Sequence, residues 1–501
     1  MPPLSHSESN QKTIIAIDQG TTSSRAILFS IDGNILDTNQ KELPLYYPEK
    51  GWVEQDANDI WADTKWALDE IISNASNPEN IATIGITNQR ETTIIWDKNT
   101  GVPIYNAIVW QDRRTADYCA SLKFSGHEEI VTAKTGLLLD PYFSATKIKW
   151  LLDNIKDARA KAEAGELLFG TVDCFLLWKM TQGKVHATDA TNASRTMLYN
   201  IVSGEWDKEL LDLFDIPSAI LPDVKDNCAE FGTYQSDIIS LPIQGMAGDQ
   251  QAASIGQACF KTGMVKATYG TGCFTLMNIG EEFRTSKNRL LTTIAYSING
   301  RVTYAMEGAI FVAGAAIQFL RDNLGFFENA ADSETLATSV PDNNDVYFVP
   351  ALTGLGAPYW QPDARAMISG LSRESTKAHI TRAALEAQAY QTHDLLNAFL
   401  EDSGHEFPVL RIDGGLAHNQ FMCQFLADIL NCKVEVPQIV ETTALGAAYL
   451  AGLQAGLYNS LDDISSQWHI AHSYTPQIDS ATRDKHLQGW KAEISRILPP
   501  N

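Results

Sequence analysis

Residues 13–29 have the sequence TIIAIDQGTTSSRAILF, and residues 264–279 have the sequence MVKATYGTGCFTLMNI. Each stretch consists of a short apolar run, a polar turn with glycine and a second apolar run, which is the pattern of two strands joined by a tight turn. Further strand-like segments follow, with hairpin turns at residues 32–33 and 299–300. Because the pattern recurs, we predict two similarly built halves that each open with a β-meander, with a boundary near residues 254–257.

The segments between these openings alternate between helix and strand patterns. Residues 56–74 carry apolar side chains at spacings of three, four and seven, which predicts an amphipathic helix, and residues 81–87 form an apolar run typical of a strand. Residues 378–400 and 420–430 also have helical periodicity, and the second of these follows a strand-like run at residues 410–415. This alternation predicts an α/β protein with helices packed on sheet faces.

Length and composition limit the class of protein. A chain of 501 residues that is 44% hydrophobic is longer than one core usually grows, so we expect a polar tail (1–12) and two domains (13–254 and 255–501). The formal charge of −23 would repel nucleic acid and anionic lipid headgroups. The chain has no apolar stretch of about 18 residues and no export signal at its start. Its seven cysteines include no C-x-x-C pair, so we expect a reduced, cytoplasmic protein without disulfides, zinc or a membrane span.

The first glycine turn is a candidate for phosphate binding. Gly20 allows close approach of the backbone, and the hydroxyls of Thr21 and Thr22 can donate to phosphate oxygens. Asp18 precedes the turn and can hold Mg²⁺ through water, because Mg²⁺ prefers oxygen ligands. The alternative is an ordinary hairpin with a polar turn.

Two further turns strengthen the phosphate interpretation. Residues 270–272 repeat the chemistry in the second half, and residues 413–415 precede a helix whose first turn includes Asn419. Three such turns in two similar halves favour a nucleotide clamp. The chain contains neither the G-x-x-x-x-G-K-[ST] run of a P-loop nor a G-x-G-x-x-G fingerprint after a strand, which disfavours both of those nucleotide-binding folds.

Polar residues of another kind predict a second substrate. Arg90 and Glu91 follow the strand at residues 81–87, and such a donor and acceptor can grip neighbouring hydroxyls; the alternative is a solvated ion pair on the surface. Asp249 lies in a glycine-flanked turn before the predicted boundary. Because phosphoryl transfer depends mainly on positioning and charge neutralisation, one carboxylate near the attacking hydroxyl suffices, and we predict Asp249 as general base. Its alternative role is the N-cap of a helix beginning near Gln251.

These motifs together resemble the FGGY family of sugar and polyol kinases over nearly the whole chain. Residues 140–147 and 366–386 are similar to the two signature regions of that family. The resemblance implies two actin-like ATPase (ribonuclease H-like) domains with a catalytic cleft between them, and ATP-dependent, Mg²⁺-dependent phosphorylation of a small polyol. Relatives form dimers and tetramers, so the resemblance also implies a homo-oligomer.

Residues 88–93, 109–115 and 249–251 are similar to the family members that phosphorylate glycerol rather than pentuloses. The resemblance therefore implies formation of sn-glycerol 3-phosphate and ADP as the first step of glycerol catabolism. It implies that glycerol is bound by Arg90, Glu91, Trp110, Tyr142, Asp249, Gln250 and Phe274, with the Trp110 and Phe274 rings against the carbon chain. It assigns the nucleotide to Thr21, Thr22, Ser23, Arg25, Thr271, Gly314, Gln318, Gly415 and Asn419, and Mg²⁺ to Asp18 through water.

Three other functions stay open at the level of the sequence. The first is a related kinase that acts on another polyol or a pentulose. The second is an actin-like ATPase that phosphorylates no small molecule, although such a protein would have no use for Arg90, Glu91 and Asp249. The third is a polyol-binding protein without catalysis.

Overall fold

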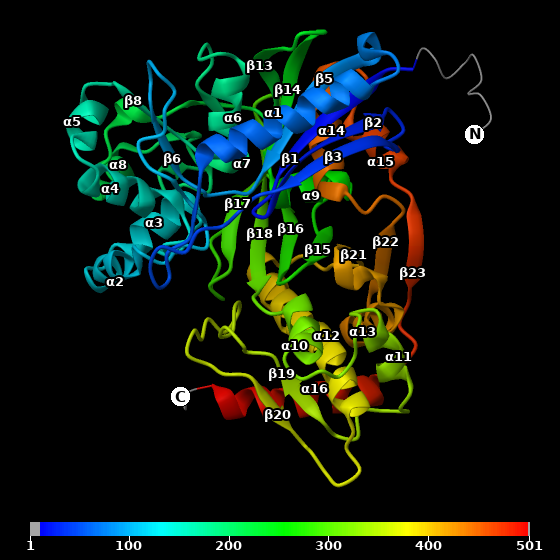
Figure 1. Cartoon of the computed structure of the whole chain (residues 1–501). Helices are drawn as coiled ribbons and strands as arrows, with labels where there is room; N and C mark the ends of the chain where they lie inside the picture. Colours follow the sequence, from blue (N-terminus) through cyan, green and yellow to red (C-terminus); the bar gives the residue numbers. More distant parts are fainter. Residues whose placement is uncertain (1–10, 499–501) are drawn as a thin grey trace.

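The computed structural model describes residues 11–498, which form an α/β architecture around two large mixed sheets (Figure 1). Residues 1–10 of the predicted polar tail lie outside the described residues. The first sheet contains, in spatial order, β13 (Cys228–Gln235), β14 (Ser240–Gly248), β5 (Ile81–Asn88), β1 (Thr13–Gln19), β2 (Ser23–Ser30) and β3 (Ile35–Glu42). The second contains β17 (Leu291–Ile298), β18 (Arg301–Ile310), β16 (Cys273–Gly280), β15 (Val265–Tyr269), β21 (Val409–Asp413), β22 (Lys433–Pro437) and β23 (Ile470–Tyr474).

The two sheets share an order and a set of strand directions. β1 is antiparallel to β2 and parallel to β5, and β15 is antiparallel to β16 and parallel to β21. β14 and β22 each add a parallel strand, and β13 and β23 each close that edge with an antiparallel one. The predicted repeat and the predicted α/β class are therefore confirmed.

One detail of the predicted meander is wrong in the second half. β16 pairs with β18, and β17 lies outside it, whereas β3 follows β2 directly in the first half. After β16, residues 281–290 lead the chain past the place next to β16, so the next strand in the sequence, β17, lies at the edge of the sheet. The turn at Asn299 and Gly300, with φ of 54° and 71°, then reverses the chain, and β18 fills the place between β17 and β16.

Helices cover the faces of the sheets, and the helices formed by residues 116–214 lie together to one side of the first sheet (left in Figure 1). In residues 11–498 the α-helices are α1 (Ala57–Asn74), α2 (Ala116–Phe124), α3 (Glu128–Thr135), α4 (Ser144–Asn154), α5 (Ala158–Glu163), α6 (Val172–Met180), α7 (Ala190–Ala193), α8 (Lys208–Phe214), α9 (Asp249–Gly256), α10 (Gly314–Asp322), α11 (Asp332–Thr338), α12 (Lys377–Ser403), α13 (Gln420–Leu430), α14 (Thr442–Gln454), α15 (Leu461–Gln467) and α16 (Ser480–Ile497). Small two-stranded sheets pair β4 (Glu54–Gln55) with β7 (Ala107–Ile108), β6 (Ile94–Asp97) with β8 (Leu167–Gly170), β9 (Ala187–Asp189) with β12 (Asp223–Lys225), β10 (Tyr199–Asn200) with β11 (Glu205–Trp206), and β19 (Tyr347–Val349) with β20 (Met367–Ser369). The helices predicted from periodicity correspond to α1, α12 and α13 and are confirmed.

Alternation along β1 explains how both faces of the first sheet are buried. Ile15 and Ile17 belong to the core that includes α1, whereas Ile14 and Ala16 belong to the core that includes α14. Successive side chains of a strand point to opposite faces, so the continuous apolar run at the start of the chain is the pattern of a central strand covered on both sides.

Helices α9 and α14 pack against each other between the two sheets, in a core that contains residues of both. A side chain at Gly446 of α14 would overlap the carbonyl of Ala252 in α9, and one at Gly85 of β5 would overlap the carbonyl of Ala447. Glycine at these two positions allows the close packing that fixes α9. The predicted division at residues 254–255 falls inside α9, and the domain limits stay a prediction.

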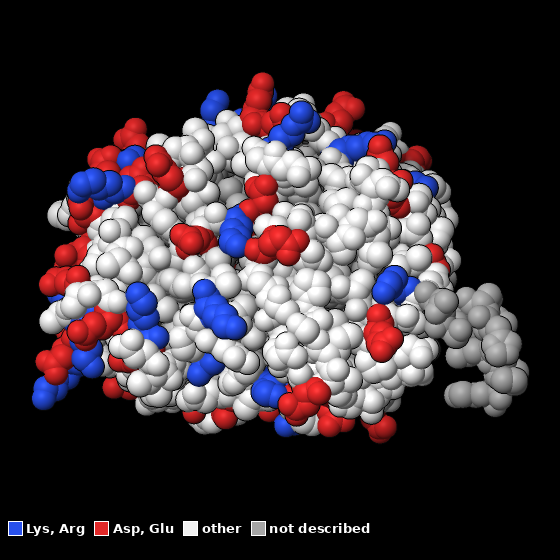
Figure 2. Space-filling view, turned by 90° about the horizontal axis from the view of Figure 1, so that it is seen from above, with Lys and Arg blue, Asp and Glu red and all other residues white. Residues whose placement is uncertain are grey.

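The sequence has more acidic than basic residues, and on the surface the two kinds of side chain are mixed (Figure 2). Acidic and basic side chains are interspersed over the face seen in Figure 2, where no broad basic area is visible. Within residues 11–498, no helix combines the length and the apolar character needed to span a bilayer. All seven cysteines are free thiols.

Candidate active site

The predicted site residues of the first half follow the ends of three neighbouring strands. β14, β5 and β1 are parallel and in register, with Gly248 beside Asn88 and Thr87 beside Asp18. Asp18 is the penultimate residue of β1, Arg90 follows β5 and Asp249 follows β14, so these three residues lie at the same edge of the sheet. The carboxyl ends of parallel strands are the usual place for a ligand in an open α/β sheet.

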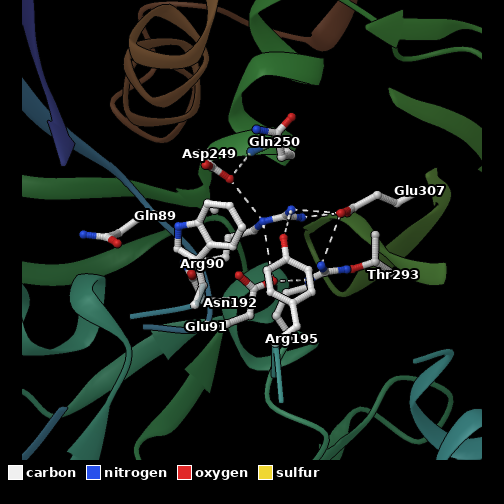
Figure 3. Close-up of polar contacts among 12 residues, drawn as sticks. Gln89, Arg90, Glu91, Asn192, Arg195, Asp249, Gln250, Thr293 and Glu307 are labelled. Carbon is white, nitrogen blue, oxygen red and sulfur yellow. Dashed lines mark hydrogen bonds and ion pairs between the residues drawn. The ribbon is translucent and has the colours of Figure 1, made fainter. Parts of the chain in front are cut away.

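Arg90 and Glu91 are 2% and 1% exposed, so the alternative of a solvated surface pair is wrong. Arg90 donates through both Nη atoms to Glu307, at 2.7 and 2.9 Å, and its Nε lies 3.1 Å from Asp249 Oδ1. Glu91 instead accepts from Arg195 Nε at 2.5 Å, whereas Arg90 Nε is 3.8 Å from Glu91. Figure 3 shows Arg90 between Asp249 and Glu307, with Arg195 beside Glu307.

Glu91 has a backbone conformation that its neighbours must maintain. Its φ of 59° lies in the left-handed region, which is costly for a residue other than glycine. The Glu91 carbonyl accepts from Ser144 Oγ at 3.1 Å and from Lys147 Nζ at 3.3 Å, and Lys147 also donates to the Tyr142 carbonyl at 2.6 Å. Lys147 therefore ties the segment with Arg90 and Glu91 to the start of α4.

The Lys147→Met variant is expected to lose stability in a pH-dependent way. Burial lowers the pKa of Lys147 from its ordinary 10.5 to about 8. Between these values the unfolded chain keeps a proton that the folded protein has released, so this group makes wild-type stability rise with pH. The variant loses hydrogen bonds to two carbonyls, worth about 1–3 kcal/mol, but no longer buries a charge. Its unfolding midpoint should therefore lie further below wild type at pH 9.5 than at pH 7.

Lys149→Met provides the control for this prediction, because Lys149 lies on the same helix but is partly exposed and pairs with Asp153 at the surface. Thermal unfolding of the three proteins at both pH values is the measurement. A gap between Lys147→Met and wild type that stays the same at the two pH values would contradict it.

Three aromatic side chains predicted to bind a polyol, two of them by packing against its carbon chain, lie together beside Arg90. The Trp110 ring is 5.4 Å from the Tyr142 ring and 6.3 Å from the Phe274 ring, between centroids. The Tyr142 hydroxyl is 3.5 Å from Arg90 Nη2, and Trp110 Nε1 donates to Thr21 Oγ1 at 2.9 Å. An apolar wall with converging polar groups suits a small ligand that has a C–H side and an O–H side.

Asp249 is the first residue of α9, and Gly248 is the N-cap, so the helix begins earlier than the predicted start near Gln251. The alternative N-cap role is therefore not the one observed, although Asp249 Oδ1 accepts from its neighbour Gln250 N at 2.6 Å. Its side chain is 33% exposed. Burial raises the pKa of the Asp249 carboxyl, while Arg90 and Lys266 act to lower it. A reachable carboxylate with a raised pKa is suited to accept a proton.

Gln250, the next residue of α9, is already engaged by the protein. Its Oε1 accepts from Lys266 Nζ at 2.5 Å, and Lys266 also donates to Thr268 Oγ1 at 3.1 Å. Lys266 is fully buried on β15, and burial lowers its pKa against the opposing charges of Asp413 and Asp249. The first residues of α9 are thus connected to the second sheet.

The first glycine turn surrounds a buried carboxylate. Asp18 is 5% exposed and pairs with Arg25, which also lies 2.9 Å from Glu441 Oε2. Burial raises the pKa of Asp18, and Arg25 acts against this effect. Thr22 and Ser23 complete the turn, which is closed by a hydrogen bond from Gly20 N to the Ser23 carbonyl at 2.9 Å. Arg25, predicted to bind phosphate, is thus already paired on both sides.

The donor set around Asp18 fits a magnesium ion that is held largely by its nucleotide. Among residues 11–498, no group of three or more His, Cys, Asp or Glu side chains is placed to hold a metal. Mg²⁺ keeps several waters and is commonly bound through one or two carboxylates and substrate phosphates, so a single aspartate beside a phosphate turn is sufficient.

The remaining nucleotide candidates fall into two groups on the second sheet. Gly314 N donates to the Gly270 carbonyl and Ala313 N to the Thr271 carbonyl, both at 2.9 Å, so the second glycine turn and the start of α10 form one unit. Gln318 is exposed further along α10. Gly415 begins a short 3₁₀ turn after β21, and Asn419 follows that turn and caps α13. Within the described residues, no hydrogen bond joins these last two to the α10 unit.

The prediction from sequence missed three buried charges of the site, Arg195, Lys266 and Glu307. Their relative exposures are all 0–1%, and each is directly bonded to a predicted residue. A signal was present for two of them, because Lys266 and Glu307 interrupt otherwise buried strands, where an ionisable side chain is rare unless it is paired. Arg195 follows α7 and has no comparable marker.

Comparisons with known proteins agree with this arrangement. A glycerol kinase of Nitrosomonas eutropha is 60% identical over 492 residues, which are 98% of this chain and 99% of that protein. A glycerol kinase of Ectopseudomonas mendocina is 55% identical over 97% of this chain and 99% of its own length. The solved structure of Plasmodium falciparum glycerol kinase with ADP has a TM-score of 0.93 and 36% identity, covering 98% of this chain and 99% of that one.

A more distant structure shows how widely the fold is shared. Xylulose kinase from Lactobacillus acidophilus has a TM-score of 0.88 at 22% identity, covering 97% of this chain and 98% of that one, which is a similarity of fold alone. Residues 13–256 match the N-terminal domain, and residues 265–455 the C-terminal domain, of the FGGY family of carbohydrate kinases. With both domains matched in order and relatives of high identity along nearly its whole length, the chain belongs to the FGGY family of carbohydrate kinases.

Proposed function

We propose that the protein transfers the terminal phosphoryl group of ATP to glycerol, forming sn-glycerol 3-phosphate and ADP. The observation that carries this proposal is the cluster of Arg90, Asp249 and the rings of Trp110, Tyr142 and Phe274 beside the first glycine turn. Its size and polarity suit a short polyol. The high identity to proteins named glycerol kinase supports the same substrate.

The site offers each part that the reaction requires. Arg90 and Tyr142 can orient hydroxyl groups, while Trp110 and Phe274 can pack against the carbon chain. The hydroxyl oxygen forms a bond to the γ-phosphorus as the bond from that phosphorus to the bridging oxygen of ADP breaks, and Asp249 accepts the hydroxyl proton. Thr21, Thr22 and Thr271 can donate to phosphate oxygens. Asp18 would hold Mg²⁺ through water, and the ion would supply positive charge to offset the negative charge of the phosphates.

The alternatives receive less support. An actin-like ATPase without a second substrate has no need for buried charges and aromatic rings that converge beside its phosphate turn. The pentulose kinases among the structural neighbours resemble this chain in fold only, at about a third of the identity seen with the glycerol kinase of Nitrosomonas eutropha. A polyol-binding protein without catalysis is addressed by the Asp249 variant discussed below.

A substrate panel tests the proposal directly. With ATP and Mg²⁺, we expect glycerol-dependent ADP production, and a kcat/KM for glycerol at least about 100-fold above those for erythritol, ribitol and xylulose, because longer chains leave hydroxyls without partners in a site built for three carbons. A coupled assay for ADP measures all four. Equal rates with a five-carbon sugar would mean that the substrate assignment is wrong.

We also propose that the protein acts in the cytoplasm as a homo-oligomer, a dimer or a tetramer, as the family resemblance implies. Light scattering coupled to size-exclusion chromatography measures the mass of the assembly. A mass equal to the 55.2 kDa of one chain would contradict the oligomer.

A further inference from the structure

Glu307 connects the two sheets at the candidate site. It lies within β18, paired with Leu276 of β16 on one side and Leu291 of β17 on the other, so its backbone is fixed in the interior of the second sheet. Its carboxylate reaches Arg90 and Arg195, which follow β5 and α7. No other charged residue of the second sheet touches Arg90 in the described structure.

The carboxylate of Glu307 is shared between two guanidinium groups. Oε2 accepts from Arg90 Nη1 at 2.7 Å, and Oε1 accepts from Arg90 Nη2 at 2.9 Å and from Arg195 Nη2 at 3.2 Å. All three side chains are at most 2% exposed. Burial alone raises the pKa of Glu307, but Arg195 and Arg90 together lower it to about 2, so the carboxylate stays ionised at neutral pH.

The contact with Glu307 determines which nitrogen atom of Arg90 contacts Asp249. Both Nη atoms of Arg90 are engaged by Glu307, so Asp249 receives only Nε, at 3.1 Å. Without Glu307, the Nη atoms would keep only the weaker contacts to Gln251 Oε1, at 3.2 Å, and the Tyr142 hydroxyl, at 3.5 Å, and could turn to the stronger two-point contact that arginine makes with carboxylates. Such a contact would engage both oxygens of Asp249 and, by stabilising the ionised carboxylate, make either oxygen a weaker acceptor for a substrate proton.

We infer that Glu307 is a positioning residue: by holding both Nη atoms of Arg90 from the second sheet, it keeps the Asp249 carboxylate available as proton acceptor. The charged groups that face Asp249 are Arg90 from the first sheet, and Lys266 on β15 and Glu307 on β18 from the second. Removing the charge of Glu307 leaves Arg90 and Lys266 against Asp249. The anion that remains beside Arg90 is Glu91, which lies further away, at 3.8 Å from Nε. The inference rests on the proposed function, because it assigns Asp249 the role of base.

Glu307→Gln is the first test, because it removes the charge and nearly keeps the shape. We expect kcat with glycerol to fall about 100-fold, the loss that a small misplacement of reacting groups can cause. The acid limb of the kcat pH profile should move to lower pH, since uncompensated positive charge stabilises the ionised form of Asp249 and makes it a weaker base. A loss of packing alone would lower the rate without moving that limb, and an unmoved limb would overturn the inference.

Glu307→Asp separates charge from reach. It keeps the anion but is one methylene shorter, so the acid limb should stay in place while KM for glycerol rises, because Arg90 is held less firmly. This variant also keeps the inference testable if Glu307→Gln does not fold. An acid limb that moves in Glu307→Asp as well would count against the role of charge.

Glu386→Gln is the matched control. Glu386 on α12 is also 1% exposed, and it accepts from Arg382 Nε at 2.9 Å and Asn343 Nδ2 at 2.8 Å, away from the candidate site. Neutralising this carboxylate should leave the pH profile of kcat in place. A shifted profile in this control would overturn the inference, because it would make the effect general to buried carboxylates.

A crystal structure of Glu307→Gln supplies a readout that does not depend on turnover. We expect Arg90 to rotate so that its Nη atoms contact Asp249. An Arg90 side chain that keeps its present position would refute the positioning role, even if activity falls. An absence of glycerol-dependent turnover in the wild-type protein would refute the proposed function instead. The crystal structure of the variant would still show whether Glu307 keeps the Arg90 side chain in its present position.

Discussion

Asp249→Asn is expected to lower kcat by about 10³-fold, within the range attributed to general base catalysis. The amide has nearly the same shape, and its oxygen can still accept from Gln250 N and Arg90 Nε, the two contacts of the present carboxylate. It cannot accept a proton from the substrate. Glycerol binding should therefore weaken much less than turnover, and titration calorimetry for binding together with a coupled assay for turnover would separate the two effects.

Asp462→Asn is a suitable control for that variant, because Asp462 is an exposed carboxylate in the first turn of α15. Its replacement should leave turnover unchanged. Near wild-type turnover in Asp249→Asn would contradict the mechanism and favour a polyol-binding protein without this base. Loss of binding and turnover to the same extent would assign Asp249 to substrate binding alone.

Asp18→Asn is expected to have the second largest effect, about a 100-fold loss of kcat/KM for ATP together with a higher requirement for Mg²⁺. Removing the charge of Asp18 takes away the carboxylate next to the first phosphate turn and leaves Arg25 paired only with Glu441. Because Mg²⁺ binds oxygen ligands and its affinity depends on their charge, the amide should hold it less well. The measurement is initial rate against Mg²⁺ concentration at fixed ATP.

The control for Asp18 lies in the same hairpin. Asp32 is exposed at the turn after β2, at the end of that strand away from the first glycine turn, and Asp32→Asn should keep the wild-type dependence on Mg²⁺. Chelation with EDTA should abolish turnover in both proteins, and added Mg²⁺ should restore it. An unchanged Mg²⁺ dependence in Asp18→Asn would remove Asp18 from the metal site.

The elements of the fold followed from patterns that are local in the chain. The helix at α1 begins after Asp56, whose side chain accepts from Asn58 N, and its apolar spacing marks the buried face. The strand β1 is a continuous apolar run because both of its faces are covered. The order of β17 and β18 was not predictable in this way, since either strand of that hairpin could pair with β16 without changing the local pattern.

The candidate site likewise has features that local sequence predicts and features that it does not. The sequence by itself determined that polar residues follow strands at Asp18, Arg90 and Asp249, and that glycine turns recur in both halves. Only the tertiary structure decided that Arg90 pairs with Glu307, 217 positions away, rather than with its neighbour Glu91. Adjacent residues of a turn point in different directions, and Glu91, with its left-handed backbone, points to Arg195. The partner of a buried charge is set by which strands the fold brings together, and local sequence carries no record of that choice.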